Sequence, residues 1–124
     1  MTVFLRGIIT PDYLPLVRDF FVAGEAGDIL VPAILDTGFS GMVVLPHAIR
    51  SAGRFEFSGV TRYELANGEV ISAELFKAAI RIGRRRLAVD VSFTDSELGL
   101  VGMALIDGKR ASFNLKTYTF RVYE

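Results

Sequence analysis

One stretch of this sequence restricts the fold more than any other. In residues 31–41 an aliphatic run leads directly into an acid, a hydroxyl and two glycines. Residues 29–35 are almost all aliphatic, a pattern typical of a strand buried on both faces. Asp36 follows at once, and a carboxylate there needs a cap or a partner to offset its desolvation. A second apolar run, residues 42–45, comes next, so the sequence predicts strand, sharp turn and strand, with Asp36 at the apex.

Two interpretations of Asp36, Thr37 and Gly38 are open from these residues alone. In the first, Asp36 and Thr37 only start a turn, and Gly38 supplies a positive φ angle. In the second, the two strands form a rigid support that presents one carboxylate for acid–base chemistry. The apolar runs on both sides of the tripeptide favour the second interpretation.

The chain resembles the retropepsin-like aspartic proteases, specifically their small single-lobe bacterial members, at three landmarks in the same order. These are residues 34–38 (Ile-Leu-Asp-Thr-Gly), a hairpin around residues 66–68 (Ala-Asn-Gly), and the apolar residues 98–105 near the C-terminus. The resemblance covers nearly the whole chain. It implies an all-β, retropepsin-like, closed or partly closed barrel with one or two short helices, formed by residues 1–124 as a single domain.

The resemblance also implies an activity, that of an aspartic endopeptidase working as a homodimer. Such enzymes need two carboxylates that share one proton and one water, because one acts as base while the other donates a proton. The chain has one Asp-Thr-Gly, so a two-fold dimer would pair Asp36 with its copy on the axis. By the same resemblance, Thr37 would fix the two active-site loops across the axis, and Gly38 would let the backbones approach closely.

The resemblance also implies that five further residues contact a peptide substrate. Phe39 and Ser40 follow the Asp-Thr-Gly, and Ala66, Asn67 and Gly68 occupy the place of the substrate-covering flap. Asn-Gly between strand-forming segments is the strongest short hairpin signal. An ordinary surface hairpin would carry the same signal, so the hairpin alone does not indicate function.

Three positions depart from the pattern of the viral relatives. Phe39 replaces a small residue and cannot donate a hydroxyl hydrogen bond to the carboxylate. Ser40 and Met103 stand where an Asp and an Arg are frequent in those relatives. The absence of both charged residues is self-consistent, because the absence of only one would leave the other charge unpaired. These departures, and a flap tip poor in glycine, favour an alternative function: a catalytically weak or inactive module of the same fold that binds peptides or dimerises.

Composition excludes several other classes of protein. Fourteen basic and fourteen acidic residues balance, so there is no general attraction to nucleic acid or to an anionic membrane. The arginine run at residues 84–86 lacks interleaved aromatics and is expected to be a solvated turn. Charged residues and prolines interrupt the apolar N-terminus before a membrane span could form. The absence of cysteine suits a cytoplasmic protein.

No cofactor or metal is expected. His47 is the only histidine and has no second histidine or cysteine near it in the sequence, so we expect neither metal binding nor catalysis from it. The glycine segments around Gly38 and Gly99 lack the spacing and the lysine of a phosphate-binding loop.

Period-two alternation and turn signals place the remaining elements. Residues 2–9 and 117–123 are apolar on one face, and we expect them to pair across the dimer as an intersubunit sheet, with pairing inside one chain as the alternative. Short helices are expected at residues 47–52 and 102–106. The other expected strands are residues 16–23, 29–35, 63–65, 70–75, 76–82, 87–93 and 98–101.

Overall fold

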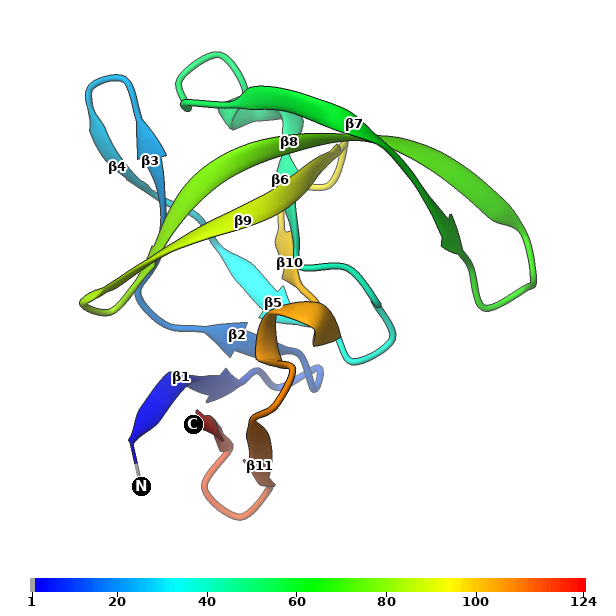
Figure 1. Cartoon of the computed structure of the whole chain (residues 1–124). Coiled ribbons are helices and arrows are strands. Elements are labelled where there is room, and N and C mark those ends of the chain that lie inside the picture. Colours follow the sequence, from blue (N-terminus) through cyan, green and yellow to red (C-terminus); the bar gives the residue numbers. More distant parts are fainter. Residues whose placement is uncertain (1) are drawn as a thin grey trace.

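The computed structural model describes residues 2–124, and this part of the chain is built of strands joined by short loops (Figure 1). Its two helical elements are single turns of 3₁₀ helix, η1 (His47–Ile49) and η2 (Met103–Ile106). The strands are β1 (Val3–Ile9), β2 (Pro15–Val17), β3 (Phe20–Gly24), β4 (Gly27–Leu30), β5 (Ala33–Leu35), β6 (Val43–Pro46), β7 (Glu56–Glu64), β8 (Val70–Ile82), β9 (Arg85–Thr94), β10 (Gly99–Val101), β11 (Arg110–Asn114) and β12 (Thr119–Tyr123). Within residues 2–124, no helix has the length and apolar character needed to span a bilayer.

The strands form one sheet that curls around an apolar core. Their order is β11-β12-β1-β2-β5-β10-β6-β9-β8-β3-β4, and β7 is added along β8. Strand β10 lies between β5 and β6, parallel to the first and antiparallel to the second. The chain leaving β5 must therefore cross the end of β10 to enter β6, and residues 36–42 make this crossing. The largest fully buried side chains are Phe20, Phe120, Leu5, Leu45, Ile80, Val22, Val31, Val43, Val91, Val101 and Val122.

Two predicted strands are each divided in the structure. The predicted strand 16–23 breaks between β2 and β3, where Asp19 has a φ of 57°. The break lets β2 pair with β1 and β5, while β3 pairs with β4 and β8. The predicted strand 29–35 breaks between β4 and β5 at Pro32, which has no N–H to give to a ladder.

The helix predicted at residues 47–52 is limited to η1. None of its residues is fully buried and only Ile49 packs, partly buried, against the core, so there is little apolar contact to extend the helix. The helical turns predicted at residues 102–106 are present as η2, which buries Leu105 and Ile106. Strand β11 was not predicted; its sequence is largely polar, and it forms because all five of its residues pair with β12.

The two terminal strands pair within one chain, so the predicted intersubunit sheet of residues 2–9 and 117–123 is wrong. Strand β1 lies between β12 and β2, and β12 lies between β11 and β1. Both edges of β12 are thereby occupied, whereas β2 covers the second edge of β1 only at residues 7–9. The β11–β12 hairpin, with Tyr118 at a φ of 55°, returns the chain so that Phe120 and Val122 are buried in the core.

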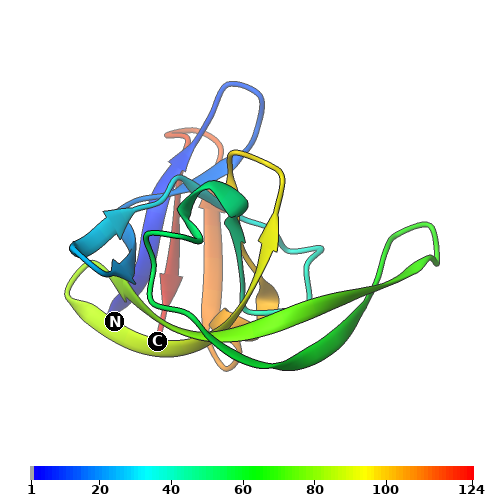
Figure 2. The ribbon, with the colours of Figure 1, turned by 90° about the horizontal axis from the view of Figure 1, so that it is seen from above.

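The long hairpin of β7 and β8 has two parts with different surroundings. Residues 76–82 of β8 pair with β9 and, at their far end, with β3, so they belong to the body of the sheet. The outer part of β8 pairs with β7 alone and projects beyond the body (Figures 1 and 2). The predicted turn at Asn67 and Gly68 closes the hairpin, with Gly68 at a φ of +83°. We call residues 60–74 the flap.

Candidate active site

Asp36 is held at the point where β5 and β10 end side by side. Its backbone N–H donates to the carbonyl of Val101 over 2.9 Å, which continues the parallel ladder by one residue. Its Oδ1 accepts the backbone N–H of Gly38 over 2.9 Å, and its carbonyl accepts the N–H of Phe39 over 3.1 Å. The half-buried carboxylate is therefore oriented by the turn that follows it.

Gly38 does not supply a positive φ angle, so the structural role considered for it from the sequence is wrong. A Cβ at this position would lie 3.3 Å from Asp36 Oδ1, which is tighter than ordinary van der Waals contact. Glycine at 38 keeps the space beside the carboxylate open.

The loop of residues 36–42 is fastened to the start of η2. Backbone N–H groups of Gly102 and Met103 donate to the carbonyls of Met42 and Phe39, each over 2.8 Å. A Cβ on Gly102 would overlap the Gly41 carbonyl oxygen and lie 2.5 Å from Cδ2 of Phe39. Only glycine at 102 permits this approach, which explains physically why a glycine ends the apolar strand β10.

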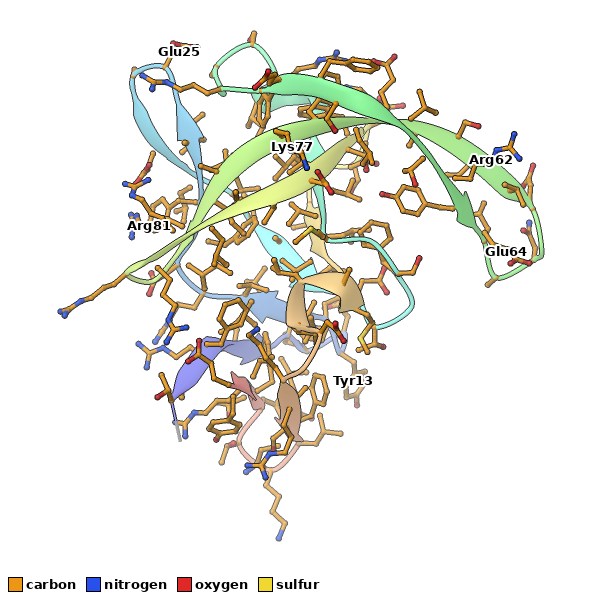
Figure 3. The ribbon with its side chains drawn as sticks, viewed as in Figure 1. Tyr13, Glu25, Arg62, Glu64, Lys77 and Arg81 are labelled. Atoms are coloured by element: carbon orange, nitrogen blue, oxygen red, sulfur yellow. The ribbon has the colours of Figure 1, made fainter. Side chains whose placement is uncertain are left out.

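A cleft of about 310 Å³ opens beside Asp36, between the loop and the flap. Flap residues alternate, so Tyr63 and Ile71 face the cleft, while Arg62 lies on the outer face of the projecting arm (Figure 3). Side chains from the loop, the flap, β6, β9 and β10 line the cleft, and most of them are apolar. They are Asp36, Gly38, Phe39, Ser40, Val44, Tyr63, Glu64, Leu65, Ala66, Ile71, Ala73, Ser92, Phe93, Thr94 and Leu100.

The cleft brings together five of the eight residues predicted for the site, namely Asp36, Gly38, Phe39, Ser40 and Ala66. The other three lie elsewhere. Asn67 and Gly68 form the exposed turn, where Asn67 Oδ1 accepts the backbone N–H of Glu69 over 2.9 Å. Thr37 is exposed and lines a separate hollow.

This second hollow has a volume of about 730 Å³, and Asp36 is the one residue that lines both it and the cleft. Apart from Asp36 and Thr37 its lining is apolar or aromatic, and Tyr13, Phe113 and Leu115 are strongly exposed (Tyr13 is labelled in Figure 3). We call it the apolar hollow. The full lining is Ile9, Tyr13, Leu14, Pro15, Ile34, Leu35, Asp36, Thr37, Phe113 and Leu115.

Tyr63 and Ser92 are cleft residues that the sequence analysis missed. Ser92 is the one polar side chain that is fully buried among the described residues, and it shares a side-chain hydrogen bond with Tyr63. Burial raises the pKa of the Tyr63 phenol, and the hydrogen bond to Ser92 offsets part of that rise. The alternation of faces along a strand could have identified Tyr63. It lies two positions before Leu65, and residues at this spacing share a face of the strand.

The strongest charge cluster stands apart from the cleft. Asp28 on β4 accepts hydrogen bonds of 2.9 Å from Arg81 and from Arg86, and these hold the pKa of its carboxyl below the usual value. None of the three residues lines the cleft. No group of three or more His, Cys, Asp or Glu side chains within residues 2–124 is arranged to hold a metal ion.

Sequence comparison finds no match, whereas structural comparison finds a protein of similar fold. No family model matches the chain, and no curated protein matches it. The chain is similar to a solved structure, a retropepsin-like aspartic protease from Rickettsia conorii, with a TM-score of 0.57 and 17% identity over 95% of this chain and 89% of that one. At this identity the likeness concerns the fold. It confirms the fold predicted from the three sequence landmarks: the chain has the all-β, retropepsin-like fold of a bacterial aspartic protease.

Proposed function

We propose that the protein is an aspartic endopeptidase that works as a homodimer. The observation that carries this proposal is the position of Asp36, a single oriented carboxylate between a flap-covered cleft and an exposed apolar hollow. One carboxylate cannot act as base and acid at once, so the site is half of a catalytic pair. A two-fold axis beside Asp36 supplies the second half from an identical chain.

In this dimer Asp36 and its copy share one proton and activate a water for attack on the peptide carbonyl. The N–H of Gly38 holds Oδ1 of each carboxylate and so limits its rotation. In the proposed dimer Thr37, which is exposed at the hollow, contacts its copy at the axis. The peptide lies extended in the cleft, with apolar side chains against Phe39, Ile71 and the other apolar residues that line it.

The apolar hollow is the surface we propose for the contact between the two chains. Strand β12 has partners on both edges and β1 pairs with it along one whole edge, so the two terminal strands are used mainly within one chain. Phe113 and Leu115 are 45% and 59% exposed beside Thr37, and β11 pairs on one side only in the described chain. An apolar face with an available strand edge is suited to an isologous contact, since the same surface serves both chains.

A second candidate function is a peptide-binding or dimerisation module that has lost its activity. It is favoured by Phe39, whose ring packs against Gly102 in place of a residue with a hydroxyl that could assist the carboxylate. This module would bind peptides in the same cleft and would form the same dimer.

Asp36→Asn distinguishes the two candidates. The protease should lose peptide cleavage by several orders of magnitude and keep its fold, because an amide cannot act as the base. Cleavage of a peptide library from pH 3 to 7 measures the loss, and Asp107→Asn, an exposed acid outside both the cleft and the hollow, is the matched control. Cleavage that survives in pure Asp36→Asn protein would exclude Asp36 as the catalytic group, and wild-type protein that binds peptides without cleaving them would favour the inactive module.

Sedimentation over a wide concentration range tests the dimer. Phe113→Glu places a charge in the apolar hollow, so it should shift the protein to monomer and abolish cleavage. Leu30→Glu is the control, because Leu30 is 63% exposed on β4 at the opposite edge of the sheet. A wild-type protein that remains monomeric when concentrated and still cleaves peptides would overturn the shared-carboxylate mechanism.

A further inference from the structure

Tyr63 lies on a projecting hairpin, yet its side chain contacts residues of two other parts of the protein. It belongs to β7, opposite Ile71 of β8, near the end of the flap. Its neighbours in the chain, Arg62 and Glu64, are exposed, whereas Tyr63 is half-buried. Its side chain therefore reaches back from the flap into the body of the protein.

One connection joins Tyr63 to the active-site loop. Its ring meets that of Phe39 edge to face, with 5.1 Å between the centroids and 60° between the planes. Its hydroxyl oxygen also approaches Gly41, where a Cβ would lie 2.9 Å from it. Phe39 is in turn fixed by the hydrogen bond from Met103 to its carbonyl. The flap thus rests on a part of the loop that is itself held by η2.

The other connection joins Tyr63 to β9 through its hydrogen bond with Ser92. Ser92 is 3% exposed, so its hydroxyl has little access to water and depends on this bond. Removing the phenol oxygen would leave a buried polar group with one partner fewer. Tyr63 consequently bridges three elements that are far apart in the sequence: the flap, the Asp36 loop and β9.

We propose that Tyr63 is a positioning residue that fixes the height of the flap above the cleft, through Phe39 on one side and Ser92 on the other. Phe39, Tyr63 and Ser92 all line the cleft, so their contacts set how much space a bound peptide finds beside Asp36. The effect of Tyr63 on substrates is inferred on the basis of the proposed protease function. The effect of Tyr63 on the position of the flap does not depend on that function.

Hydrogen exchange of the flap amides in the free protein tests the proposal without any need for catalysis. Tyr63→Phe keeps the ring contact and loses the hydrogen bond, so exchange at residues 64–71 should rise about fivefold. Tyr63→Ala loses both contacts and should raise exchange roughly thirtyfold. Exchange in residues 20–24 of β3 should stay unchanged, because that strand lies in the body of the sheet.

Val60→Ala is the matched control on the same strand. Val60 is 66% exposed and lies on the outer face, so its truncation removes apolar area from the flap without touching the cleft. Flap exchange in this variant should match the wild type. Equal exchange in Tyr63→Ala and Val60→Ala would overturn the proposal.

Cleavage kinetics give the second measurement. Loss of flap position should raise KM for apolar peptides about tenfold in Tyr63→Ala and leave kcat within about twofold, because Asp36 keeps its own contacts. Tyr63→Phe should fall between this variant and the wild type. A fall in kcat with unchanged KM would contradict a positioning role. If the wild type cleaves no peptide, the protease function fails, and the exchange comparison alone decides the role of Tyr63.

Discussion

The two sides of the cleft are held in place by different means. The Asp36 loop leaves β5, in which Ala33 and Leu35 are buried, and enters β6, in which every residue is buried, and backbone hydrogen bonds tie it to η2. The flap has few such supports. Val60, Val70 and Ile71 are 66%, 56% and 42% exposed, and the outer part of β8 pairs with β7 alone.

This difference separates the site into a rigid half and a movable half. A carboxylate that exchanges a proton with a partner must be kept within a fraction of an ångström of its working position, which a packed core provides. A cover must open to admit a peptide, and segments with few buried contacts open at low cost in free energy. The packed core therefore supports Asp36, whereas the flap is free to move, and Tyr63 connects the two through its contacts with Phe39 and Ser92.

A large effect on stability is expected from Gly102→Ala, which disturbs the support of the rigid half. The added Cβ would overlap the Gly41 carbonyl oxygen, a backbone atom that cannot turn aside as a flexible side chain can, so the loop must shift at a cost of about 3 kcal/mol. Gly38→Ala is the matched change in the same loop and should cost less than about 1 kcal/mol, since its Cβ would meet only the Asp36 carboxylate at 3.3 Å. Urea unfolding of both variants measures the difference, and equal losses would show that the loop has no rigid support at Gly102.

A pair of truncations compares the two halves directly. Leu45→Ala removes a side chain that is 0% exposed and should lower the free energy of unfolding by about 2–5 kcal/mol. Ile71→Ala, on the inner face of the flap, should lower it by less than about 1 kcal/mol. The same Ile71 variant should weaken peptide cleavage about tenfold, because Ile71 lines the cleft. A large loss of stability in Ile71→Ala would mean that the flap is part of the core.

The smallest effect is expected from Asp28→Asn, which probes the anchored end of β8. The hydrogen bonds from Arg81 and Arg86 lower the pKa of Asp28 in the folded state, so the ionised carboxylate stabilises the fold above its ordinary pKa of 3.8. This contribution is lost as the pH falls through the lowered value. The thermal midpoint of Asp28→Asn should lie slightly below that of the wild type at pH 7, and the two should converge in acid.

Asp107→Asn serves as the control for the general effect of removing a negative charge, and flap exchange should be unchanged in both variants. A midpoint difference that stays constant down to pH 2 would show that Asp28 acts through something other than its charge. Faster flap exchange in Asp28→Asn would mean that the two parts of β8 are not independent.

Local sequence determined the two features that define the site. The aliphatic run before Asp36 and the apolar run after Gly41 were enough to predict strand, turn and strand, because burial on both faces leaves a simple pattern. The flap turn at Asn67 and Gly68 was equally readable, since Asn-Gly suits a tight hairpin. Pro32 was a sequence signal for the break between β4 and β5, although the aliphatic residues on both sides of it made the segment look like one continuous strand.

Tertiary structure alone decided which strands meet. Strand β1 pairs with β12 at the other end of the chain, and β10 separates β5 from β6, so the hydrogen-bond partners lie far apart in the sequence. The contact of Phe39 with Tyr63 and the close approach of Gly102 to Gly41 arise in the same way. Hydrophobic alternation specifies which face of a strand is buried, but it does not specify which other strand pairs with it.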